Sequence, residues 1–170
     1  MRWERLFHDL EGQVEAAEDA AFRAEVQDRT RAERAAITLA SRLHDATDVE
    51  LALTLVDGST VRGVVADAAS QWVLLGGGTQ RLIPVHAISA IRGLPARSVE
   101  VGPVAQRLSL GYALRALARD RVRVVVDTAG GQVQGLIAKV GADFLEVSQG
   151  SQGLVAIPTQ SIVQVREAAL

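Results

Sequence analysis

The feature that most constrains the fold is an internal repeat. Residues 61–66 (VRGVVA) align with residues 133–138 (VQGLIA), and at the same spacing residues 71–74 (QWVL) align with residues 143–146 (DFLE). After a two-residue insertion the match continues with Ile83-Pro84 against Ile157-Pro158, Ile88 against Ile162, and Ile91-Arg92 against Val165-Arg166. Such self-similarity predicts one supersecondary unit that is built twice.

Each repeat has the hydrophobic period of β-strands. In the first strand, apolar residues alternate with polar or small ones at Val49, Leu51, Leu53 and Leu55, and the turn Asp57-Gly58 follows. Period two bounded by such a turn predicts an antiparallel meander. Further strands are expected over residues 61–65, 71–75, 81–85 and 89–92. The first strands of the two repeats align only if the turn at residues 129–131 is one residue longer.

A glycine recurs in the middle of the second strand of each repeat, at Gly63 and Gly135. A strand that bends sharply to serve both halves of a small barrel has little room for a side chain at the bend. The repeated glycine therefore favours a barrel over a flat sheet.

Helical spacing precedes each repeat. From Arg2 to about Leu43 the chain has one glycine and no proline, and apolar residues recur every three or four positions. We expect one long helix, or two with a break near Asp28 to Thr30. Its alanine-rich stripe predicts a coiled-coil partner helix, and the alternative is a solvated arm that covers its own barrel. A second helix is expected to start after Gly102-Pro103, include Val104 and end at about Arg119.

Four motifs resemble the Sm-like family of small β-barrels, and most closely its bacterial riboregulator branch, Hfq. The resemblance covers about 45 residues of each repeat and is carried by Leu55–Gly63, Gln71–Leu75 and His86–Ser89 in the first repeat and by Ala116–Val122 in the second. It implies an α+β, mainly β fold with a helix before each of two tandem five-stranded barrels. Other SH3-like barrels share this strand pattern and stay an alternative.

The expected boundaries follow from the repeat and the resemblance. We expect an N-terminal helical arm over residues 1–45, a first barrel over residues 46–94, a helical linker belonging to the second repeat over residues 95–121, and a second barrel over residues 122–170.

The resemblance also implies sites for single-stranded RNA. Gln71 and Trp72 take the places of a glutamine and a base-stacking aromatic, and His86 takes the place of a histidine beside the uridine pocket. Arg119 and Arg121 match part of an arginine patch, and Arg115 lies one turn earlier on the helix. Stacking on an aromatic ring with polar groups at the base edges is the usual way to bind single-stranded RNA.

The sequence departs from the family pattern near these positions. Pro84 and Val85 replace a tyrosine and a lysine, Ala118 replaces an arginine, and in the second repeat Asp143 and Gln160 replace the glutamine and the histidine. Each implied site residue also has a structural interpretation. An aromatic repeated at one strand position, as in Trp72 and Phe144, is more often part of a core. His86 is compatible with a hydrogen-bonded strand histidine, and the arginines with a solvated helix face.

Composition narrows the class of protein. There is no cysteine, and His8, His44 and His86 lie far apart without metal-ligand spacing, so neither a metal nor a cofactor is expected. The glycines at 76–78 lack the Lys-Ser/Thr and the helix of a phosphate loop. The carboxylates near the N-terminus fall on a solvated helix rather than in a dry cleft. We therefore expect no catalytic residues and no enzyme.

Net charge and hydropathy indicate which ligands and which cellular location suit the protein. The net charge is −2, which disfavours a generic polyanion binder, but residues 95–121 carry five arginines against two acids. No stretch has the length and apolarity of a signal peptide core or a membrane span, so a cytoplasmic protein without a membrane partner is expected.

Three functions remain open at this point. The first is a non-enzymatic protein that binds single-stranded RNA. The second is a protein–protein scaffold, and the third is a transcription- or ribosome-associated factor that docks through its helix. In each case we expect a homo-oligomer, a dimer or a trimer, held by the helix and by strand edges, because small barrels leave edges that must be paired.

Overall fold

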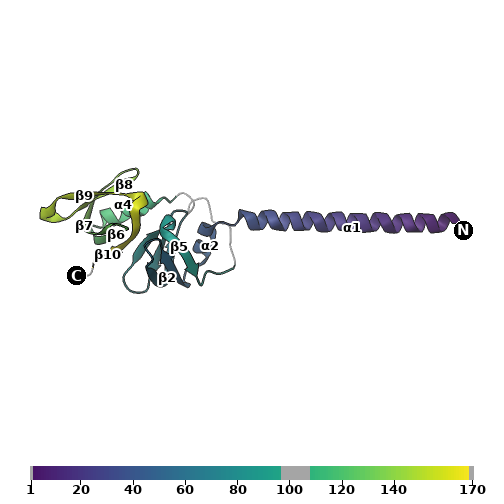
Figure 1. Ribbon diagram of the computed structural model, residues 1–170, viewed down its shortest axis with the longest axis horizontal. Helices are drawn as coiled ribbons and strands as arrows, with labels where there is room; N and C mark the ends of the chain where they lie inside the picture. Colours follow the sequence, from purple (N-terminus) through teal and green to yellow (C-terminus); the bar gives the residue numbers. More distant parts are fainter. Residues whose placement is uncertain (1, 97–107, 169–170) are drawn as a thin grey trace. The chain divides into compact units, whose positions relative to one another are not determined.

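A computed structural model describes the backbone over residues 2–96 and 108–168, and the side chains from residue 16 onward within those ranges, except at 33 and 36 (Figure 1). Two compact units are present, Met1–Ile37 and Thr38–Leu170. The first unit is a helix, and the second contains all the strands.

Helix α1 spans Arg2–Ala36 without interruption at Asp28 to Thr30, so a break at that point is wrong. A single helix reaching to residue 43 is also wrong, because α1 ends at Ala36 and a separate helix, α2, spans Leu39–Asp45. The restart has a local cause. Thr38 has an extended backbone, and its hydroxyl accepts a hydrogen bond from the Ser41 N–H at 3.1 Å, which caps α2.

The second unit has two similar runs of strands. The first run comprises β1 (Glu50–Leu55), β2 (Thr60–Ala68), β3 (Trp72–Gly76), β4 (Arg81–Pro84) and β5 (Ile88–Arg92). Helix α4 (Leu110–Arg119) leads into the second run, which comprises β6 (Arg123–Thr128), β7 (Gly131–Val140), β8 (Phe144–Ser148), β9 (Leu154–Pro158) and β10 (Ile162–Glu167). Short 3₁₀ turns occupy Val85–Ala87, Gly150–Gln152 and Thr159–Ser161.

The ten strands form one continuous antiparallel sheet in the order β5-β1-β2-β3-β4-β10-β6-β7-β8-β9. The prediction of two tandem five-stranded barrels is therefore wrong. The two runs merge because β4 pairs with β10, with Leu82 opposite Val165 and Arg81 opposite Arg166.

The cores cross this junction as well. Trp72 and Leu82 come from the first run but belong to the hydrophobic cluster of the second, which also contains Leu110 and Leu114 of α4. Val163 of β10 belongs to the cluster of the first run. Each run thus completes the core of the other, and this mutual burial of apolar surface favours the merged sheet over two separate bodies.

Strand register relates the two runs residue by residue. Leu51 pairs with Gly63 in the first run, and Val124 pairs with Gly135 in the second. The two residues of the second pair are one residue closer in the chain than those of the first. The turn at residues 129–131, which we expected to be one residue longer than its counterpart in the first run, is therefore shorter. Both glycines are closely approached by backbone: a Cβ on Gly63 would lie 2.7 Å from the Gly76 carbonyl oxygen, and one on Gly135 would overlap the Ser148 carbonyl. The lack of room at both positions agrees with the sequence argument, although the strands do not form separate barrels.

Helix α4 begins after Ser109, whose hydroxyl accepts a hydrogen bond from the Tyr112 N–H at 3.2 Å, and it ends at Arg119, as expected. The expected start of this helix, including Val104, lies outside the described residues. No helix in the described part of the chain combines the length and the apolar character that crossing a bilayer requires.

Candidate nucleic-acid interface

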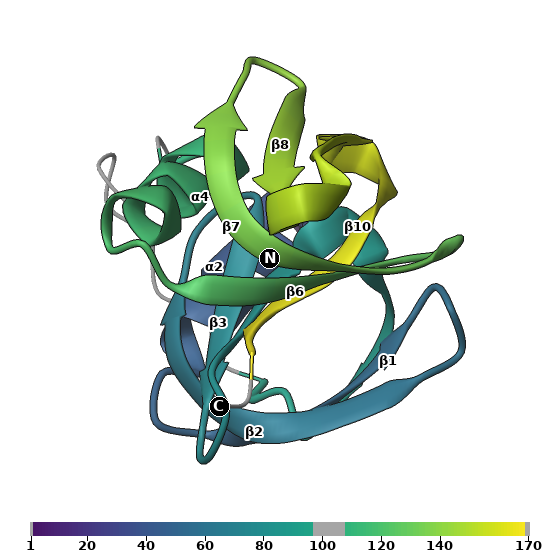
Figure 2. The same cartoon turned by 90° about the vertical axis from the view of Figure 1, so that its left-hand side faces the viewer.

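A groove of about 740 Å³ lies where α4 packs beside β7, an arrangement visible in Figure 2. We call it the basic groove. It is lined by Tyr112, Arg115, Ala118, Arg119, Arg121, Leu136, Ile137, Ala138, Lys139, Val140 and Ser148. Three of the six predicted site residues, the arginines at 115, 119 and 121, therefore meet in one concave surface.

The electrostatics of the basic groove are one-sided. Its lining contains four cationic side chains and no carboxylate. All four are exposed, and within the described ranges none of them forms an ion pair. Arg121 is held in the turn after α4 by a left-handed backbone conformation with φ of 51°. Positive charge that is not neutralised from within the protein is available to an anionic ligand.

An aromatic ring and an aliphatic side chain complete the groove. Tyr112 is 50% exposed and Leu136 is 40% exposed. Tyr112, Arg115 and Arg119 follow one another at three and four residues along α4, so they share one face of the helix. Lys139 lines the groove from β7, and its Nζ lies 5.8 Å from the centroid of the Phe144 ring on β8. The groove thus offers cations for phosphates and a ring for stacking.

A second hollow of about 660 Å³, the polar pocket, adjoins the basic groove and shares Arg115 with it. It spans both runs of strands and is lined by Ser70, Gln71, Val85, His86, Ser109, Leu110, Gly111, Arg115, Gly141, Ala142, Thr159 and Gln160. The predicted residues Gln71 and His86 lie here, beside Gln160.

Gln71 and His86 also connect the two runs. The Oε1 atom of Gln71 accepts a hydrogen bond from the Leu110 N–H at 2.9 Å, and His86 Nε2 lies 3.2 Å from the Ile162 carbonyl oxygen. One polar atom of each side chain is therefore engaged within the protein. Among the described residues no further hydrogen bond engages the amide nitrogen of Gln71 or the Nδ1 atom of His86, so these two atoms can contact a ligand.

Trp72 lies elsewhere. Its side chain is 5% exposed and packs in the hydrophobic core with Leu110 and Leu114. A base cannot stack on a ring that is covered in this way. Trp72 is therefore a core residue, which is the structural interpretation that an aromatic residue repeated at positions 72 and 144 favours. The exposed ring of this region is Tyr112 instead.

Sequence reasoning missed Tyr112 and Lys139. They are the only tyrosine and the only lysine of the chain. Helical spacing alone could have placed Tyr112 on the face of Arg115 and Arg119. Nothing local in the sequence indicates that Lys139, on β7, lies opposite that face.

The described residues contain no group of three or more His, Asp or Glu side chains placed to hold a metal ion. Comparison with known proteins finds no family model that matches this chain and no curated protein that is similar to it.

Proposed function

We propose that this protein is a non-enzymatic binding protein for single-stranded RNA, and that the basic groove is the RNA-binding surface. The observation that carries the proposal is the lining of the groove: four exposed cations, no carboxylate and a half-exposed tyrosine. Cations that contact phosphates together with rings that stack on bases are the usual means of binding single-stranded nucleic acid.

The adjoining polar pocket indicates the path that a bound RNA strand would take. A strand whose phosphates contact Arg119 and Arg121 would pass Arg115, which lines both hollows, and reach Gln71 and His86. Side-chain amides and imidazoles hydrogen-bond to the exposed edges of unpaired bases. The resemblance to the Hfq-like branch at Gln71 and His86 belongs to this proposal.

A protein-interaction scaffold is the second candidate. It is favoured by α1, where Phe22 is 68% exposed and Val26, one turn later, is 46% exposed. Within the described ranges nothing covers this apolar pair, and a partner helix could bury it. On this account the function lies in α1, and the cations of the basic groove serve only solubility.

Fluorescence anisotropy with short labelled U-rich and A-rich RNAs, at low and physiological salt, separates the two candidates. The RNA proposal predicts affinity that falls steeply with salt, because each phosphate contact on a single strand contributes about 0.7 to the logarithmic salt slope. It also predicts that Arg119→Ala/Arg121→Ala weakens binding by about tenfold or more.

The control is Arg29→Ala/Arg31→Ala, which removes two exposed arginines from α1. Its affinity for RNA should stay close to that of the unchanged protein. Absence of RNA binding at low salt, or an equal loss in both double variants, would reject the basic groove as the binding surface.

A further inference from the structure

Lys139 differs in reactivity from the other cations of the basic groove. It is the only lysine among the 18 lysine and arginine residues of the chain. An amine that gives up its proton forms an amide with an acyl donor, whereas a guanidinium keeps its proton and does not react in this way. Acylation also removes the positive charge of the lysine. Lys139 is therefore the one cation of the groove lining that an acyl donor can neutralise.

A β-bulge in β7 directs this side chain into the groove. The ladder shifts by one position between Ile137 and Lys139, so Ala138 is an extra residue on β7. In a regular strand, residues two apart point to the same face. Because of the bulge, Ile137 is buried in the core while Lys139 is exposed in the groove. The first run shifts in the same way between Val65 and Asp67, so only the second run presents an amine at this point.

The amine of Lys139 is accessible, and its surroundings attract anions. Within the described ranges Lys139 forms no ion pair, not even with Glu146, its neighbour across the ladder on β8. Arg119, Arg121 and Tyr112 line the same groove. Cations gathered in a concave surface raise the local concentration of anionic reactants. An anionic acyl donor is therefore concentrated beside the one side chain that it can acylate.

Thioesters of coenzyme A are the acyl donors that this lining suits. Coenzyme A carries phosphates and an adenine ring, which are groups that a strand of RNA also presents. Arginines bind phosphates through charge-assisted hydrogen bonds, and an exposed aromatic ring stacks on a base. Arg119 and Arg121 would contact the phosphates, and Tyr112 would contact the adenine. The flexible pantetheine arm of the donor joins these groups to the thioester and allows it to reach Lys139.

We propose that Lys139 is acylated by thioesters of coenzyme A and that this modification weakens RNA binding. The inference rests on the proposed function, because the same side chains would hold RNA and the nucleotide part of the donor. In the reaction, the unprotonated Nζ attacks the carbonyl carbon of the thioester, and the carbon–sulfur bond breaks. The thiolate of coenzyme A leaves and takes up the proton that the nitrogen releases, and a neutral amide remains on Lys139.

The first test is incubation with acetyl coenzyme A. Peptide mass spectrometry measures the acetylated fraction of Lys139 and separates it from the N-terminal amine. Arg119→Ala/Arg121→Ala should slow this acetylation by about fivefold or more, because the phosphates of the donor lose their partners. The control Arg29→Ala/Arg31→Ala should not slow it. S-acetyl-N-acetylcysteamine, a thioester without a nucleotide, should react at similar rates with the unchanged protein and with the groove variant.

The second test measures the RNA affinity of the acetylated protein by fluorescence anisotropy. One phosphate contact is lost, so the logarithmic salt slope should fall by about 0.7 and the affinity at low salt by about threefold. Lys139→Gln, which resembles the neutral amide, should show the same loss. Lys139→Arg should retain RNA binding and resist acetylation at this position.

The inference is overturned if acetyl coenzyme A leaves Lys139 unmodified, or if the groove variant and the α1 variant react alike. It is also overturned if both thioesters respond in the same way to the loss of the arginines, or if the acetylated protein binds RNA as tightly as before. RNA binding that needs Arg119 and Arg121 and persists alongside any of these results leaves the proposed function intact. Acetylation that depends on these arginines, in a protein that binds no RNA, would contradict the proposed function instead.

Discussion

The two runs of strands share a register but differ in the surface that each presents beside its helix. In the second run, α4 and β7 place Arg119, Arg121 and Lys139 around the basic groove. The equivalent residues of the first run are Ala46, which is fully buried, Asp48 and Asp67. Asp48 even shares the left-handed backbone of Arg121, with φ of 65° against 51°.

This difference teaches that the backbone geometry does not determine the charge of the groove. The same strand–turn–strand frame carries cations in one run and neutral or acidic residues in the other. A short helix, α2, is tied to the sheet in the first run by His44 Nδ1, 3.2 Å from the Ala68 carbonyl oxygen. The positive charge of the basic groove is therefore a property of its side chains.

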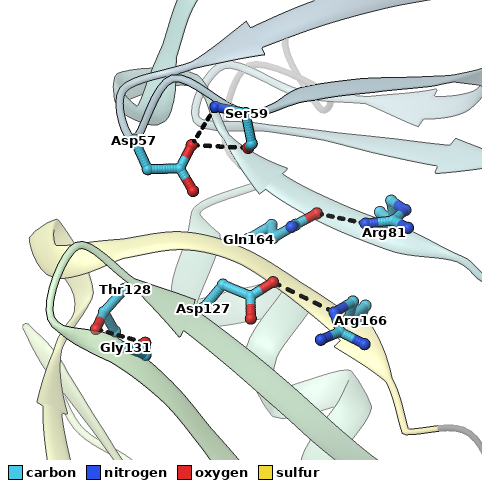
Figure 3. A network of polar contacts seen from close by, with 8 residues as sticks. All are labelled: Asp57, Ser59, Arg81, Asp127, Thr128, Gly131, Gln164 and Arg166. Carbon is cyan, nitrogen blue, oxygen red and sulfur yellow. Dashed lines mark hydrogen bonds and ion pairs between the residues drawn. The ribbon is translucent and has the colours of Figure 1, made fainter.

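The largest expected difference between the two runs is in the free energy of unfolding, and it concerns Asp127. The equivalent residue of the first run is Thr54. Asp127 is 6% exposed, and its Oδ2 accepts a hydrogen bond from Arg166 Nε at 3.3 Å, while its Oδ1 has no partner (Figure 3). Arg166→Met would leave a buried carboxylate unpaired, at a cost of about 4 kcal/mol in unfolding free energy. Arg92→Met, at the equivalent exposed position, should change it by less than about 0.5 kcal/mol in urea titrations. Equal effects would show that the ion pair contributes nothing.

Substitution of the repeated glycine by alanine should also destabilise the two runs unequally. A Cβ at Gly135 would overlap the backbone of Ser148 and lie 2.8 Å from Val147 Cγ1, whereas at Gly63 the nearest atom is 2.7 Å away. Overpacking of this kind destabilises, so Gly135→Ala is expected to lower the unfolding free energy by about 3 kcal/mol and Gly63→Ala by about 2 kcal/mol. Thermal unfolding would measure both, and a neutral Gly135→Ala would contradict the close approach.

Tyr112 is expected to have a smaller effect, on RNA affinity alone. Stacking of one base on an exposed ring is worth roughly 1 to 3 kcal/mol, so Tyr112→Ala should weaken binding by about tenfold. Tyr112→Phe keeps the ring and should bind within about twofold of the unchanged protein. Anisotropy titration checks both, and a Phe variant as weak as the Ala variant would transfer the contribution from the ring to the hydroxyl.

The smallest effect concerns the turns between the first two strands of each run. The Ser59 hydroxyl and N–H donate to Asp57 Oδ1 at 2.7 and 2.9 Å, and these hydrogen bonds lower the pKa of Asp57 below its ordinary value of 3.8. Because the folded-state pKa is the lower one, the stabilisation is present above pH 3.8 and is lost as the pH falls through the folded value. Ser59→Ala should raise the Asp57 pKa toward 3.8, as measured by NMR titration.

The turn of the second run provides the control for that prediction. It contains no carboxylate: the Thr128 hydroxyl donates to the Gly131 carbonyl oxygen at 2.9 Å (Figure 3). The same hydroxyl accepts a hydrogen bond from the Gly130 N–H at 3.2 Å. Thr128→Ala should therefore destabilise by an amount that does not vary between pH 3 and pH 6. A pH-dependent effect there would contradict the assignment of the titration to Asp57.

Local pattern predicted the strands but not their assembly. Alternation at Leu51, Leu53 and Leu55 is a property of neighbouring residues, and β1 lies where that alternation predicts it. The two runs merge because β4 pairs with β10, which lies about 80 residues further along the chain. The sequences of β4 and β10 resemble those of β9 and β5, the two strands at the outer edges of the described sheet. Periodicity cannot tell an edge that is paired within the chain from one that is free.

The candidate site was predicted in part for the same reason. Arg115, Arg119 and Arg121 are close in sequence, so a helix and its following turn bring them together. Trp72 and Phe144 hold equivalent strand positions, yet Trp72 is buried because it lies at the inner junction under α4, while Phe144 is partly exposed. Tertiary packing, which the repeat does not encode, decides between these two environments.

The most direct test of the central claim is to give the groove the side chains of the first run, in the variant Arg119→Ala/Arg121→Asp/Lys139→Asp, and to measure RNA affinity as a function of salt. If the basic groove binds RNA, affinity should fall by at least about thirtyfold at low salt, and the logarithmic salt slope should decrease by about 2, for three lost phosphate contacts. An unchanged slope and affinity in a variant that remains folded would contradict the claim and leave α1 as the functional surface.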